Sequence, residues 1–260
     1  MRSVLVQADA SPAGRVRIET ALSLARMTGG HVTLLVDTPI SRYVAIDAMG
    51  GGTVAAEAMK DAIAQDDTFA REIDAQVARE DVPCVVLRAE AEPVDAVAAA
   101  ARLADVVIVA RREALASDLP MAIRAPVLAV NDDVPLCFPL TNAAVAWDGS
   151  NQAAYALRCA VPLLATCAAV TVLTVEDSPE GFPATDAVVY LSRHGIKAEL
   201  QVLQRLGAIE ETLARELVLL EAQVLVMGAF KHSRLREFLF GGVTRYFLED
   251  PSGPALLLAH

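Results

Sequence analysis

The sequence is poor in residues that bind metals or form disulfides, with four cysteines and four histidines in 260 residues. Structural metal sites need clustered thiolates or imidazoles. The cysteines form no C-x-x-C pair, and the histidines are not clustered. We therefore expect no metal site and read the cysteines as buried, reduced thiols. The cysteines are Cys84, Cys137, Cys159 and Cys167.

Long apolar runs are also missing. None reaches the roughly 18 residues that a membrane-spanning helix needs. The start of the chain goes directly into a strand-like run at residues 3–6, without the apolar segment and cleavage site of a signal peptide. We expect a cytoplasmic protein.

Positive charge is scarce. The net charge is −11, although 54% of the residues are hydrophobic, which is ample for a buried core. Binding to a polyanion needs clustered cations, so we expect no nucleic-acid partner. The same charge argues against attachment to an anionic membrane.

Familiar catalytic motifs are absent as well. The sequence has no G-x-x-x-x-G-K-[ST] loop, no G-x-G-x-x-G turn and no G-x-S-x-G elbow. It also lacks the Ser-Gly-Gly-x-Asp-Ser loop and the His-x-Gly-His pair of adenylating or pyrophosphate-releasing ligases. We name no catalytic residue and expect that the protein is not an enzyme.

What the sequence does contain is the same succession of segments twice. Four matched pairs occur in the same order, which predicts a duplicated unit. The pairs are 3–11 with 143–150, 31–39 with 170–179, 104–110 with 222–228, and 125–130 with 253–258. We predict one domain at 1–134 and another at 141–260, divided by a segment containing Pro135 and Pro139.

Each half alternates short Val/Leu/Ile runs with helical periodicity. Continuous apolar runs are typical of strands buried on both faces of a parallel sheet. The prediction is therefore an α/β fold with a five-stranded, mostly parallel sheet flanked by helices in each half. Ligands of such sheets bind at the carboxyl ends of the strands, so the residues that follow each strand are the candidates for function.

The halves differ in the connection that follows their fourth strand, at 104–110 and 222–228. It has 15 residues in the first half (111–125) and 25 in the second (229–253). The longer connection ends in Gly241-Gly242 directly before a helical run, an arrangement that lets backbone N–H groups approach an anion. Residues 228–247 carry four cations and one anion, a local charge of +3 that suits a phosphate.

On these residues the chain resembles the universal stress protein family, twice over and along its whole length. The resemblance implies two tandem adenine-nucleotide-hydrolase-like, Rossmann-like domains. Family members that bind ATP carry G-x2-G-x9-G-[S/T]. Gly228 and Gly241 occupy the first and third positions, whereas Lys231 and Gly242 replace the second and fourth, with Thr244 two residues beyond. In the first half, Ala110 replaces the first glycine and the rest is deleted.

The resemblance also implies which residues contact a nucleotide in the second half. The phosphate contacts fall on Gly228, Gly241, Gly242 and Val243, and the adenosine contacts on Ala146, Asp148, Val175 and Met227. Lys231 either obstructs the space that a glycine leaves free or places an ammonium beside the phosphates.

Simpler interpretations of the same residues stay open. Asp148 and Ser150 are residue types that form turns and cap helices for local reasons. Gly241 and Gly242 could serve only close helix–strand packing, and Met227 belongs to the core with or without adenine.

The function expected from the resemblance is a stress-response regulator whose second half binds ATP, with magnesium, or AMP. The alternative is a ligand-free scaffold for unidentified protein partners. Related single-domain proteins pair through their last strand, so we expect the two halves to form an intramolecular pseudo-dimer. The apolar strand at 255–258 must then be paired or covered. Further pairing into a homodimer is left open.

Overall fold

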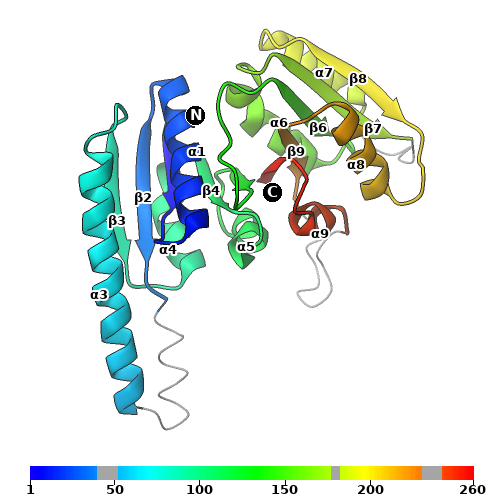
Figure 1. Ribbon diagram of the computed structural model, residues 1–260. Helices are drawn as coiled ribbons and strands as arrows, with labels where there is room; N and C mark the ends of the chain where they lie inside the picture. The colour runs from blue at the N-terminus through cyan, green and yellow to red at the C-terminus, as the bar shows by residue number, and fades with distance from the viewer. Residues whose placement is uncertain (40–51, 177–181, 230–241) are drawn as a thin grey trace.

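The structure is a computed structural model that describes residues 1–39, 52–176, 182–229 and 242–260. Its described strands form one ten-stranded sheet in the order β3-β2-β1-β4-β5-β10-β9-β6-β7-β8 (Figure 1). Within the described ranges, no helix is long and apolar enough to cross a membrane.

Each half contributes five consecutive strands to this sheet. The first half contains β1 (Ser3–Gln7), α1 (Pro12–Thr28), β2 (His31–Asp37), α3 (Gly52–Val77), β3 (Cys84–Ala89), α4 (Pro93–Ala100), the short 3₁₀ helix η1 (Ala101–Leu103), β4 (Val106–Ala110), α5 (Ala114–Ala122) and β5 (Val127–Val130). The second contains β6 (Asn142–Ala146), α6 (Asn151–Leu164), β7 (Ala169–Val175), α7 (Ala184–Arg193), β8 (Ala198–Leu203), α8 (Ile209–Leu219), β9 (Val224–Gly228), α9 (Gly242–Glu249) and β10 (Ala255–Ala259).

Within each half all neighbouring strands are parallel, as the helical connections between them require. The predicted pair of Rossmann-like domains is therefore confirmed. The two halves join where β5 and β10 pair antiparallel, with Leu257 opposite Leu128. This seam covers the apolar last strand and makes the expected intramolecular pseudo-dimer a single continuous sheet.

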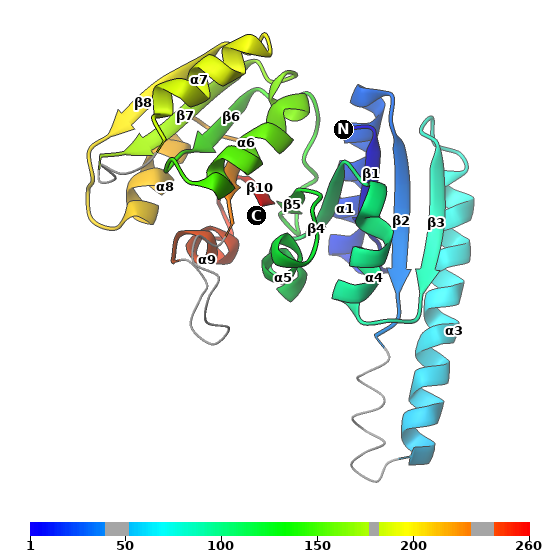
Figure 2. The same ribbon diagram turned by 180° about the vertical axis from the view of Figure 1, so that it is seen from behind.

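Helices cover both faces of the sheet (Figures 1 and 2). One buried cluster joins the sheet to α1, α3, α6 and α7, and the other joins it to α4, α5, α8 and α9. The inner strands β4, β5 and β10 are buried at every residue, which is the reason that they read as unbroken apolar runs.

The two outermost strands differ from the sequence interpretation, which treated all strands as buried on both faces. Exposed and less exposed residues alternate along most of β3, and Val85 and Leu87 are 40% and 41% exposed. Val202 on β8 is 54% exposed. An outermost strand is paired on one side only, and helices cover only part of its surface, so apolar composition alone overstated its burial.

The segment between β5 and β6 also ties the halves together. The backbone N–H of Leu136 donates to Thr20 Oγ1 at 3.0 Å, and that of Phe138 donates to Ser23 Oγ at 2.9 Å, so this segment lies along α1. On the other side of the seam, Tyr155 Oη on α6 donates to the carbonyl oxygen of Arg124 at 2.7 Å. The two halves are thus held by more than their shared strands.

Candidate functional site

The candidate site of the second half lies at the carboxyl ends of β6, β7 and β9. Val145 pairs with Val226, so Ala146, the last residue of β6, lies beside Met227, the last residue but one of β9. Ala146 is half-buried, whereas Met227 is 5% exposed and belongs to the core, as the simpler interpretation held. Val175, half-buried, is the last residue of β7 on the other side of β6.

Asp148 organises the turn between β6 and α6. The backbone N–H of Ser150 donates to Asp148 Oδ1 at 3.0 Å, and Ser150 Oγ in turn accepts from the N–H of Ala153 at 3.2 Å as the helix cap. Gly149 between them has φ = 72°, a backbone conformation that glycine adopts without strain. Asp148 itself is exposed. Asp148 and Ser150 therefore form the turn and the helix cap that the simpler interpretation expected, and Asp148 also lies at the surface.

The residue before this turn anchors the segment that enters α7. The backbone N–H of Trp147 continues the strand pairing by donating to the carbonyl oxygen of Leu173 at 2.8 Å. Its indole Nε1 donates to the carbonyl oxygen of Phe182 at 2.9 Å, and the N–H of Phe182 donates to the carbonyl oxygen of Gly149 at 3.1 Å. Trp147 is 6% exposed, so its large side chain is part of the core.

Gly228 lies against the first turn of α6. A Cβ atom at this position would stand 2.6 Å from the backbone nitrogen of Ala153 and 2.6 Å from the carbonyl carbon of Gln152. Neither atom can move without displacing the helix. Packing between β9 and α6 therefore explains this glycine without a ligand.

The start of α9 is the other half of the candidate site. Gly242 is exposed, and among the described residues the nearest atom to a Cβ placed there would be Glu210 Oε1, at 4.0 Å. Val243 is half-buried, and Thr244 is 3% exposed, so its side chain is part of the interior. The predicted contacts Lys231 and Gly241 lie outside the described residues.

The first half repeats the turn but uses its aspartate differently. The N–H of Ser11 donates to Asp9 Oδ1 at 2.7 Å, and Ser11 Oγ caps α1 by accepting from the N–H of Gly14 at 2.9 Å. Arg17, which is fully buried, forms an ion pair with Asp9. Its Nε also donates to the carbonyl oxygen of Gln7 at 3.0 Å, and its Nη1 lies 3.6 Å from Glu113 Oε1.

The charges of this network shift each other's ionisation. Burial opposes ionisation of Asp9, but hydrogen bonds from Ser11 and the charge of Arg17 outweigh it and hold the pKa of that carboxyl below its usual value. For Glu113, burial prevails over the charge of Arg17, and Asp9 adds repulsion, so the pKa of Glu113 is raised. Burial likewise raises the pKa of Asp37, although Gln7 donates to it.

At the position in α6 that corresponds to this arginine, the second half carries an alanine. Arg17 stands six residues after the cap Ser11, and the residue six places after the cap Ser150 is Ala156, which is fully buried. The aspartate of the first half is therefore committed to an ion pair with the helix that follows it, whereas α6 carries alanine at the equivalent position. The sequence interpretation separated the halves by the deleted loop and missed this second difference.

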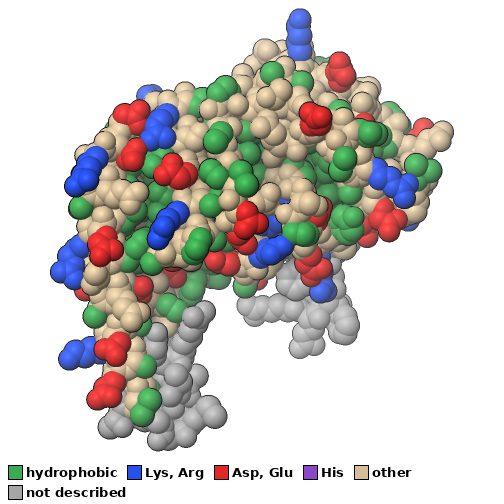
Figure 3. Space-filling view, in the orientation of Figure 1, with side chains coloured by type: hydrophobic (Ala, Val, Ile, Leu, Met, Phe, Trp, Pro, Cys, Tyr) green, Lys and Arg blue, Asp and Glu red, His purple; other side chains and the backbone are tan. Residues whose placement is uncertain are grey.

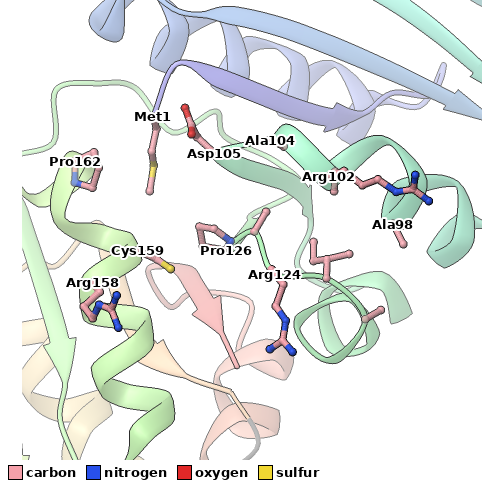
Figure 4. A pocket seen from close by; sticks show the side chains of 14 residues that line it. Met1, Ala98, Arg102, Ala104, Asp105, Arg124, Pro126, Arg158, Cys159 and Pro162 are labelled. Atoms are coloured by element: carbon pink, nitrogen blue, oxygen red, sulfur yellow. The ribbon is translucent and has the colours of Figure 1, made fainter.

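Two cavities lie elsewhere on the molecule. One of about 680 Å³ lies between η1, the start of β5 and α6, with Arg102, Arg124 and Arg158 around it (Figure 4). The other, of about 600 Å³, separates the start of α5 from α9 and has Arg111 in its wall. None of the predicted site residues within the described ranges lines either cavity.

The cysteines were expected to be buried, and none of them is fully buried. Cys137 is exposed, whereas Cys84, Cys159 and Cys167 are half-buried and all four are free thiols. Burial raises the pKa of Cys167 to about 11, so this thiol stays protonated and unreactive at neutral pH.

Comparison with known proteins supports the interpretation of the second half. The model of the universal stress protein family matches residues 140–258. A search of curated proteins found no match.

Solved structures match the whole chain. A universal stress protein from Archaeoglobus fulgidus has a TM-score of 0.67 at 15% identity, over 98% of this chain and 97% of that one. A protein of unknown function from Pseudomonas aeruginosa has a TM-score of 0.63 at 15% identity, over 100% and 92%. A putative universal stress protein from the same species has a TM-score of 0.58 at 15% identity, over 100% and 93%. At such identities the likeness establishes the fold alone.

Proposed function

Because this chain belongs to the universal stress protein family through its residues 140–258, and its first half repeats the same fold, we propose that it is a non-enzymatic stress-response regulator whose second half binds an adenine nucleotide. The nucleotide is ATP with magnesium, or AMP. The first half serves as a structural partner that does not bind nucleotide.

The difference between the two aspartates carries this proposal. Asp9 is paired with the buried Arg17, so a ligand at the first site would have to compete with an internal ion pair. Asp148 occupies the equivalent turn, is exposed, and has Ala156 where the arginine would stand. A ribose or adenine group at the carboxyl end of β6 can therefore reach the exposed carboxylate of Asp148, whereas the carboxylate of Asp9 is held by Arg17.

The start of α9 supports the phosphate end of the same site. Gly242 is exposed and leaves open space around its Cα, and the first N–H groups of a helix attract anions. The cations of the preceding connection, Lys231 among them, would add to this attraction through their charge. We therefore place the phosphates at the N-terminus of α9 and the nucleoside beside β6.

The test is a calorimetric titration of the nucleotide-stripped, full-length protein with Mg-ATP and separately with AMP. We expect one nucleotide per chain, and an affinity at least about tenfold lower for Asp148→Asn, since loss of a hydrogen bond to a charged group is worth about 1.5–3 kcal/mol. Asp186→Asn, an exposed aspartate in the first turn of α7, is the matched control and should bind like the wild type.

Lys231→Gly, titrated in parallel, decides the role of that position. Binding by the wild type that weakens in this variant makes Lys231 a phosphate ligand. Binding that appears only in the variant shows that lysine closes the site. If neither the wild type nor Lys231→Gly bound Mg-ATP or AMP, the proposal would be overturned.

A ligand-free scaffold is the second candidate, and two observations favour it. Gly228 is explained by its contact with α6, and Thr244 is buried, so two of the expected contacts have structural roles of their own. Failure of both titrations with an intact fold would leave this function in front.

A further inference from the structure

The cavity of about 680 Å³ shown in Figure 4 is formed by both halves of the chain. Arg102 lies on η1 and Arg124 directly precedes β5, both in the first half, whereas Arg158 lies on α6 in the second. We call this cavity the arginine groove. Its volume falls in the range of ordinary ligand sites, which often lie between domains.

The charge of the groove is unusual for this protein. Arg102, Arg124 and Arg158 are all exposed, and no carboxylate of the described residues pairs with their guanidinium groups. Three cations without an ion-pair partner among the described residues surround this cavity, in contrast to a chain of net charge −11 and to the face in Figure 3, where both signs are interspersed.

The acid in the groove is already engaged. Asp105 Oδ2 accepts from the backbone N–H of Arg2 at 2.5 Å and from that of Ser3 at 3.0 Å. Burial opposes its ionisation, but these hydrogen bonds outweigh the effect and lower the pKa of Asp105. Its charge is thus directed at the start of β1 and offsets the three arginines only in part.

The positions of the arginines indicate the shape of the ligand. Figure 4 shows their guanidinium groups at three separate places around the groove, with none converging on a common point. A compact anion would meet one of them. An extended peptide presents side chains of one face at intervals of about 6.6 Å, so it can bring several carboxylates to separated cations.

The floor and the wall of the groove favour a peptide as well. Apolar residues such as Ile123, Pro126 and Pro162 line it between the arginines. Helix α5 ends in the wall at Ala122, and the carbonyl end of a helix carries a partial negative charge. That end repels a free phosphate and can accept hydrogen bonds from the N–H groups of a peptide.

We propose that the arginine groove binds an extended acidic segment of a partner protein, with carboxylates facing the three arginines and apolar side chains on the floor. Because both halves form the groove, the partner would recognise the assembled tandem and not either half. The proposal does not depend on nucleotide binding at α9.

The probe is a fluorescein-labelled synthetic peptide of alternating glutamate and leucine, followed by fluorescence anisotropy on the full-length protein. The double variant Arg124→Glu/Arg158→Glu reverses two exposed charges that make no ion pair with the described residues, so its fold should be retained. We expect its affinity to fall at least about tenfold, and Arg124→Lys/Arg158→Lys to keep most of the binding. Arg193→Glu/Arg215→Glu on α7 and α8 changes the net charge equally and should bind like the wild type.

Hydrogen exchange locates the bound peptide, which should protect residues 98–105 and 122–126. If Arg193→Glu/Arg215→Glu lost as much peptide affinity as Arg124→Glu/Arg158→Glu, the peptide would be attracted by the overall charge of the protein and not by the groove. That result would overturn the proposal. Equal binding of a peptide with glutamine in place of glutamate would also overturn it, because the carboxylates would then not be needed. Displacement of the peptide by pyrophosphate at equal charge concentration would overturn it as well, because it would indicate a site for small anions. Absence of binding at low salt would overturn it as well.

Discussion

Arg111 Nη1, at the end of β4 in the first half, donates to the backbone carbonyl oxygen of Asp250 in the second half at 2.6 Å. The same guanidinium donates to the carbonyl oxygens of Gly253 at 3.0 Å and of Pro254. Arg111 is 2% exposed, and its Nε has no hydrogen-bond partner in the described structure. One side chain of the first half thus holds the turn that leads into β10, directly beside the seam.

Replacing this arginine tests how strongly it joins the halves. Arg111→Met should lower the free energy of unfolding by about 2–4 kcal/mol, because three carbonyl groups lose their donor while most of the buried volume stays filled. Urea denaturation at neutral pH measures the change. Burial lowers the pKa of Arg111 to about 10, so the wild-type side chain is charged under these conditions. Arg112→Met, at an exposed neighbouring position, should stay within about 0.5 kcal/mol of the wild type. If Arg111→Met and Arg112→Met changed the free energy of unfolding equally, the hydrogen bonds of Arg111 would contribute little to stability.

Gly228 tests the packing explanation of a residue that the sequence assigned to a ligand. Gly228→Ala should destabilise the protein by about 1–3 kcal/mol, since its Cβ would overlap the backbone of α6. Gly242→Ala is the control, because the space around that residue is open. It should be neutral or slightly stabilising when both are compared by thermal unfolding. A neutral Gly228→Ala would show that the strand and the helix can separate without cost.

Gly242 also separates folding from phosphate binding. Gly242→Asp places a carboxylate at the N-terminus of α9, where it favours the helix and repels phosphate. We expect unchanged thermal stability and at least about tenfold weaker Mg-ATP binding by calorimetry. Gly242→Asn, which adds a similar volume without charge, should bind more tightly than the aspartate variant. Equal affinity of the two would place the phosphates elsewhere.

Asp37 predicts a dependence of stability on pH. Burial raises its pKa above that of the unfolded chain, which is about 3.9. The folded state therefore retains this proton longer, and stability falls as the pH rises through the folded pKa. Asp37 Oδ1 accepts from Gln7 Nε2 at 3.1 Å, while Gln7 Oε1 is buried without a partner in the described structure.

Asp37→Asn should remove the contribution of this carboxyl to the pH dependence of stability. The amide N–H of the new side chain can also donate to Gln7 Oε1. We expect the variant to be more stable than the wild type by about 0.5–1 kcal/mol at pH 7, from one added hydrogen bond. Urea denaturation at a series of pH values should show the difference shrinking below about pH 4, where both wild-type states are protonated. A difference in stability between variant and wild type that stays constant at every pH would mean that it comes from packing and not from ionisation of Asp37.

The sequence predicted the fold well because apolar periodicity reports burial directly. The last strand, for example, is paired as its apolar edge required. Burial of β3 and β8 was overestimated, since residue type does not reveal which strands end a sheet. The side of α1 that faces the core could have revealed Arg17, because Gly14, Ile18 and Ala21 share its helical face.

The candidate site was less predictable because spacing does not distinguish a ligand contact from a packing contact. A strand-end glycine fits an approaching phosphate and an approaching helix equally, and at Gly228 the helix is present. Arg111 carried no signal in the sequence, since its partners are backbone carbonyls 139 to 143 residues away.

The antiparallel seam has a consequence for how this molecule meets others. The strands β5 and β10 run in opposite directions, and β4 and β9 are parallel to them, respectively. The carboxyl ends of β4 and β9 therefore point to opposite edges of the sheet, one on each side of the seam. Helix α9 spans this distance, beginning at Gly242 on one side and leading to Asp250, held by Arg111, on the other. A ligand docked on one side would therefore leave the other side sterically accessible.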